Sequence, residues 1–113
     1  MTITLKNLVP GTSQLTASAA TYYTAPNGTG AKINNASAMN TDSSARTFTV
    51  HIVPSGGTAS NSNMVINAKA LQPGETYNCP ELVGKNIMTG GTIQALASVT
   101  TTVSFQVSGI EQT

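Results

Sequence analysis

The residues that could carry acid–base or nucleophilic chemistry are few in this sequence. It contains one histidine, His51, and four acids: Asp42, Glu75, Glu81 and Glu111. A serine or cysteine triad would need His51 beside an acid and a nucleophile, and nothing in the sequence brings such groups together. A single histidine also falls short of the ligand set of a zinc site. We therefore expect no catalytic residue, no metal site and no cofactor, and we interpret His51 as a solvated or interface residue.

The remaining candidates for chemistry are equally weak. Cys79 is the only cysteine, so no internal disulfide can form, and we interpret it as a small buried or half-buried apolar residue. Glu75 and Glu81 could formally act as a glycosidic acid pair, but their spacing in a turn-rich segment is a weak signal. The segment "VPSGGTASNSNMV", Val53 to Val65, has neither the GxxxxGK[ST] nor the GxGxxG spacing of a phosphate-binding loop. We interpret it as an exposed, pliable connection that could touch a neighbouring protein.

Composition excludes several classes of partner. The five basic residues are scattered and the formal net charge is +1, so we expect no binding to nucleic acid. The sequence has no run of about twenty apolar residues, so we expect no membrane span. The first residues do not resemble a secretory signal. Charged residues make up only 8% of the 113 residues, far below the roughly one quarter that is usual. A surface of Thr, Ser and Asn can be buried against protein without stranding a charge.

Hydrophobic periodicity predicts an all-β chain that forms one domain over residues 1–113. Arg46–Pro54 alternates apolar and polar residues, which indicates a half-buried strand with His51 on its polar face. The same alternation appears around Val103, Phe105 and Val107, and more weakly around Ile93, Ala95 and Ala97. Five further segments are expected to be strands: Thr2–Lys6, Leu15–Thr24, Ala31–Met39, Met64–Leu71 and Glu75–Cys79.

Turn signals separate these segments. In "QPGE", Pro73 and Gly74 occupy the central positions expected of a type II turn. About eight short strands spaced by such turns predict an antiparallel β-sandwich of jelly-roll type. The segment "MVINAKALQ", which starts at Met64, is the one place where a short helix is an alternative.

The order of several segments resembles that of small virion proteins of tailed bacteriophages. These segments are "YYTAPNGTGAKI", "TFTVHIVPSGGTASNSNMV", "LQPGETYNCPELVGKNIMTGGTIQALAS" and "VSFQVSGIE". The resemblance extends from about Tyr22 to Glu111. It implies a sandwich or jelly-roll protein that decorates or cements a capsid, made in the host cytoplasm and located on the capsid surface of the virion. It brings no catalytic residues.

From the resemblance and the composition we expect a non-enzymatic decoration protein that bridges capsomers of the major capsid protein lattice. A homo-oligomer is expected, with a trimer favoured over a dimer. The alternative is a tail- or fibre-associated virion protein or a receptor- or glycan-binding module. Residues 1–10 are expected either to add a strand to a neighbour's sheet or to be the first strand of their own domain. The candidate interface residues are Thr2, Ile3, Leu5, Asn27, Thr29, Ser55, Thr58, Ser60 and Asn61.

Overall fold

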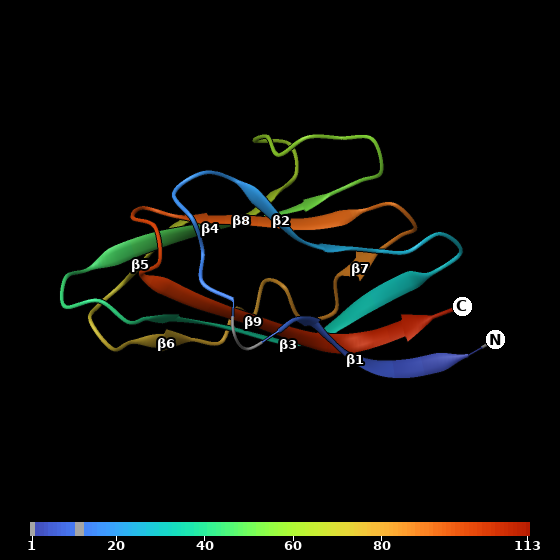
Figure 1. Cartoon of the computed structure of the whole chain (residues 1–113), viewed down its shortest axis with the longest axis horizontal. Helices are drawn as coiled ribbons and strands as arrows, with labels where there is room; N and C mark the ends of the chain where they lie inside the picture. Colours follow the sequence, from blue (N-terminus) through green and yellow to red (C-terminus); the bar gives the residue numbers. More distant parts are fainter. Residues whose placement is uncertain (1, 11–12) are drawn as a thin grey trace.

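The computed structural model describes residues 2–10 and 13–113, which form nine β-strands and no helix (Figure 1). The strands make two antiparallel sheets, so the predicted all-β, sandwich-like fold is confirmed. One sheet has the strand order β1-β9-β3-β6, with β7 also beside β3, and the other has the order β2-β8-β4-β5. A jelly-roll order of connections remains a prediction. The strand bounds are β1 (Ile3–Val9), β2 (Ala20–Thr24), β3 (Gly30–Asn40), β4 (Arg46–Val53), β5 (Met64–Leu71), β6 (Thr76–Tyr77), β7 (Asn86–Ile87), β8 (Thr92–Ala97) and β9 (Val103–Gln112).

Each segment that the sequence predicts to be a strand overlaps one of these strands. Met64–Leu71 is the strand β5, so the helical alternative for this segment is wrong. The expected strand Leu15–Thr24 is regular only from Ala20, although Leu15 is buried and its amide donates to the carbonyl of Val103. The two-residue strand β7 was not predicted, because periodicity cannot be read from so short a segment.

The predicted alternation of β8 and β9 is confirmed by burial. Their inward residues come from alternate positions and belong to one hydrophobic cluster that joins the two sheets: Ile93, Ala95, Ala97, Val103, Phe105 and Val107. The predicted type II turn is also present, because Gly74 has a φ of 76° and the amide of Glu75 donates to the carbonyl of Gln72. Local sequence patterns therefore account for most of the core.

Strand β9 lies between β1 and β3, and both neighbours shift their register beside Ser108. Leu8 is an extra residue in β1 and Asn34 is an extra residue in β3, so each strand carries a bulge there. The next residue of β9 is Gly109, where a Cβ atom would collide with the carbonyl oxygen of Lys32. Glycine therefore permits the close approach of β3 to β9.

The N-terminal segment is an integral strand of this chain. It pairs with β9 from Ile3 opposite Gln112 to Val9 opposite Val107. Leu8 and Val9 are buried in the core, so the expected arm of residues 1–10 is anchored within its own domain. Met1 lies outside the described residues. Of the two alternatives, this pairing matches the first strand of the same domain.

Replacing Gly109 with alanine should destabilise the fold, since the new methyl group cannot be placed without moving the backbone of β3. We expect Gly109→Ala to lower the free energy of unfolding by about 2–4 kcal/mol. Gly30→Ala is the matched control in the same sheet, because its Cβ would meet no atom closer than 3.9 Å. Urea denaturation of both variants measures the difference. Equal stability of the two variants would contradict the close approach at Gly109.

Candidate functional site

Several of the predicted interface residues gather at one end of the sandwich. Ile3 of β1 and Gly30 of β3 both lie opposite Gln112, near the two termini (Figure 1). The β2–β3 loop reaches the same end, where the Thr89 hydroxyl donates to the carbonyl of Thr29 at 2.9 Å. A Cβ atom on Gly90 would collide with the Ser55 hydroxyl, which brings the start of the β4–β5 loop close by. The fold thus joins three segments that are far apart in the sequence.

Thr29 is a correction within this set. It is buried, and its amide donates to the carbonyl of Pro26 across a tight turn whose Gly28 has a φ of 74°. The turn projects Asn27 into solvent and withdraws Thr29 beneath it. Thr29 is therefore not available as a contact residue.

The β4–β5 loop is exposed, as expected, but it has an ordered framework of hydrogen bonds. The Asn63 side chain donates to the carbonyl of Thr58 at 2.8 Å and accepts from the Ser60 amide at 3.0 Å. Ser55, Thr58, Ser60 and Asn61 are all exposed. Asn63 therefore holds the course of the loop from Thr58 to Ser60, while the pliability of this segment stays a prediction.

His51 lies under this loop, so the expectation of a solvated or interface histidine is wrong. Its side chain is buried, and Nδ1 is 3.1 Å from the carbonyl of Ser60 and 3.0 Å from the side-chain oxygen of Asn63. Because both partners are acceptors, Nδ1 must carry a hydrogen and act as the donor. Alternation correctly placed His51 opposite the core, but it could not reveal that a loop covers that face.

Several other titratable groups make contacts with their neighbours. The carboxylate of Glu75 accepts from the Gln72 amide, and that of Glu81 accepts from the Tyr77 hydroxyl. Lys69 lies over the Tyr77 ring at 4.9 Å from its centroid. The described residues contain no group of three or more His, Cys, Asp or Glu side chains that could hold a metal ion.

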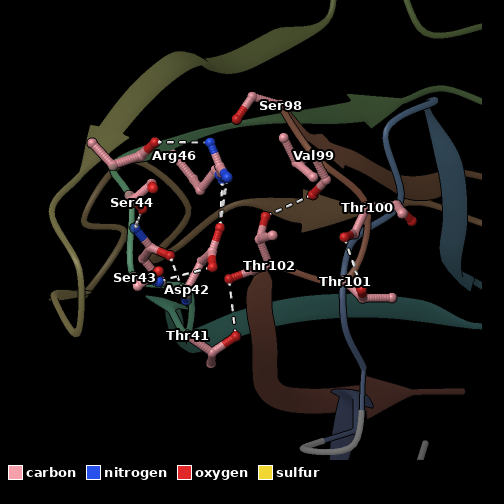
Figure 2. A network of polar contacts seen from close by, with 12 residues as sticks. Thr41, Asp42, Ser43, Ser44, Arg46, Ser98, Val99, Thr100, Thr101 and Thr102 are labelled. Atoms are coloured by element: carbon pink, nitrogen blue, oxygen red, sulfur yellow. Dashed lines mark hydrogen bonds and ion pairs between the residues drawn. The ribbon is translucent and has the colours of Figure 1, made fainter.

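A network of polar contacts closes the opposite end of the sandwich (Figure 2). Arg46 donates to the Asp42 carboxylate through Nε at 2.8 Å and approaches it through a second nitrogen at 2.6 Å. The Ser43 amide and this guanidinium hold the pKa of Asp42 below its usual value. Buried Asn40 donates to two backbone carbonyls and accepts from the Asp42 amide. These contacts join residues of the β3–β4 turn to one another and to the neighbouring backbone. We therefore interpret them as stabilising the turn.

The most unusual surface feature is strand β1, which ends the five-stranded sheet. Leu5 is 83% exposed and Ile3 is 56% exposed. Their partners on β9, Ile110 and Gln112, lie on the face turned away from the second sheet, whereas the alternate residue Glu111 points inward and accepts from the Tyr23 hydroxyl at 2.6 Å. Two branched apolar side chains are therefore presented to solvent at the margin of the sheet.

A shallow groove continues this surface across β9 and β3. It is lined by Gly30, Lys32, Asn86, Met88, Ile110 and Gln112. Met88 is 72% exposed, which adds a third strongly exposed apolar side chain to this end of the molecule. Sequence analysis placed Ile3 and Leu5 in the interface but missed Met88 and Ile110, which the register of β3, β7 and β9 brings to the same face.

No protein-family model matches the chain, and no curated protein or solved structure matches it either. Among the residues that the structure describes, no helix is long and apolar enough to cross a membrane. The candidate surface is thus described from the geometry of this chain alone.

Burial should make the single thiol unreactive while the protein is folded. Desolvation, followed by the nearby Glu81 carboxylate, raises the pKa of Cys79 to about 12. Since the thiolate is the reactive form, we expect Ellman's reagent at pH 8 to label the folded protein at least about a hundredfold more slowly than the protein in concentrated urea. A native rate close to the denatured rate would show that Cys79 is accessible and would contradict this placement.

Proposed function

We propose that this chain is a non-enzymatic structural protein of a tailed-bacteriophage virion that decorates and stabilises the capsid by bridging capsomers. It would be made in the host cytoplasm and would act on the capsid surface. The observation that carries the proposal is the pair of exposed apolar residues, Ile3 and Leu5, on a strand at the margin of a sheet, in a chain of which only 8% of the residues are charged.

The resemblance to small virion proteins gives the first support. Its segments occur in the expected order from Tyr22 to Glu111, and each lies in a strand or turn of the sandwich. A jelly-roll order of connections belongs to the same proposal. The resemblance suggests which type of virion protein this is. The exposed apolar residues of β1 suggest that it binds another protein.

The surface gives the second support. Complete burial of a leucine side chain such as Leu5 is worth about 2 kcal/mol, which is modest for one contact. A decoration protein binds a repeated lattice, where modest contacts multiply over a linked oligomer. We propose a homo-oligomer, with a trimer favoured and a dimer possible, whose footprint spans neighbouring capsid subunits. Binding only the intact lattice would stabilise it by mass action without any chemical step.

The alternative is a tail- or fibre-associated virion protein or a receptor- or glycan-binding module. Glycan recognition commonly uses exposed aromatic side chains, and this chain has three tyrosines, two phenylalanines and no tryptophan. Tyr23 and both phenylalanines, Phe48 and Phe105, are buried. We therefore favour the capsid over a glycan as the binding partner.

Heads that carry this protein should retain their DNA to a higher temperature than heads that lack it, because the bound oligomer stabilises the closed lattice. The measurement is dye-detected DNA release during heating of the two head preparations. Adding back the purified protein should restore the difference, and light scattering of the same sample gives its oligomeric state.

Substitution of the exposed Leu5 by a charged residue should abolish the protection of the heads against DNA release. Leu5→Asp places a charge in the proposed contact, whereas Val99→Asp is the matched control in an exposed loop at the opposite end of the sandwich. Bare and decorated heads that release DNA at the same temperature would contradict the cement function. Labelling of the tail in intact virions would favour the alternative.

A further inference from the structure

Among the described residues, strand β1 is paired with another strand on one side only. Thr2 and Thr113 exchange two hydrogen bonds, from the Thr2 amide to the Thr113 carbonyl and from the Thr113 amide to the Thr2 carbonyl. In an antiparallel ladder such pairs alternate, so Thr4 and Lys6 also face β9. The amides and carbonyls of Ile3 and Leu5 therefore point away from the sheet. We call this side of Ile3–Lys6 the β1 edge; no strand among the described residues pairs with it.

We propose that the β1 edge takes an extended acidic segment of another protein as an additional β-strand. This inference deepens the proposed function. Its geometry does not depend on that function; only the identification of the partner as a capsid protein rests on it. The same two residues, Ile3 and Leu5, present free backbone groups and exposed apolar side chains. An incoming strand would form hydrogen bonds with the free backbone groups and would cover the exposed apolar side chains at the same time.

Lys6 is the reason that we expect the partner segment to be acidic. It lies on the other face of β1 from Leu5, its side chain is 46% exposed, and its ammonium group is 3.6 Å from the Glu111 carboxylate. Glu111 already accepts a short hydrogen bond from the Tyr23 hydroxyl. The Lys6 ammonium makes no hydrogen bond among the described residues, so a carboxylate on the neighbouring strand can accept one from it.

The same lysine disfavours self-pairing of this chain in the register centred on Lys6. Two copies that paired antiparallel about Lys6 would place their two ammonium groups opposite each other. A lysine in an edge strand is also a common guard against such self-pairing. An acidic segment turns this repulsion into attraction, which favours a different chain as the partner.

The test is an NMR titration of the whole isotope-labelled protein with two synthetic peptides, acetyl-Val-Glu-Val-Glu-Val-Glu-Val-amide and its counterpart with lysine at each glutamate. We expect the acidic peptide to shift and protect the amides of Ile3 and Leu5, and the basic peptide to have no effect. Leu5→Pro removes an amide that faces away from β9 and should weaken binding about tenfold. Leu5→Thr is the matched control that keeps the amide, and it should retain measurable affinity.

Several outcomes would overturn the proposal. These are no binding of the acidic peptide, equal binding of both peptides, shifts confined to another surface, and equal affinity of Leu5→Pro and Leu5→Thr. Binding of anionic phosphatidylglycerol vesicles through Ile3 and Leu5 in place of the peptide would assign this edge to a lipid surface. Peptide binding at the β1 edge by a protein that does not attach to heads would support this inference and contradict the proposed function alone.

Discussion

Strand β9 is paired along both of its edges, and the arrangement of the five-stranded sheet depends on this double pairing. Its register with β3 runs from Val103 to Gln112, and its register with β1 runs from Val107 to Gln112. Both neighbours insert an extra residue beside Ser108, and Gly109 allows the β3 backbone to come close. A side chain at Gly109 would separate β3 from β9 and disturb the register that orients β1.

The bulge at Leu8 determines which side chains of β1 meet water. Without an extra residue, Val9 would share a face with Ile3 and Leu5. With it, Leu8 and Val9 are buried while Ile3 and Leu5 remain exposed. The strand is thereby anchored by its second half and keeps its first half available. Its inner face is also tied across the sandwich, because Glu111 binds Tyr23 of the second sheet and approaches Lys6.

The sequence predicted what depends on local pattern, and it failed where distant segments decide the outcome. The alternation in β4, β8 and β9 and the turn at Gln72–Glu75 required only neighbouring residues. The burial of His51 came from the β4–β5 loop that folds over it, which periodicity cannot reveal. The candidate surface shows the same division: Ile3 and Leu5 were predicted from the first strand, but the open edge of that strand is a property of the sheet order. Met88 and Ile110 joined the surface only through pairing of β7 and β9 with β3.

The most direct test of this account is amide hydrogen exchange of the free protein, resolved residue by residue along β1. The account predicts slow exchange at Thr4 and Lys6, whose amides face β9, and fast exchange at Ile3 and Leu5, whose amides face solvent. Equal protection of all four amides would mean that the edge is covered. Rapid exchange at all four would mean that β1 is not held by β9. Either result would contradict the claim that β1 is an anchored strand with one open edge, which is the feature on which the proposed contact depends.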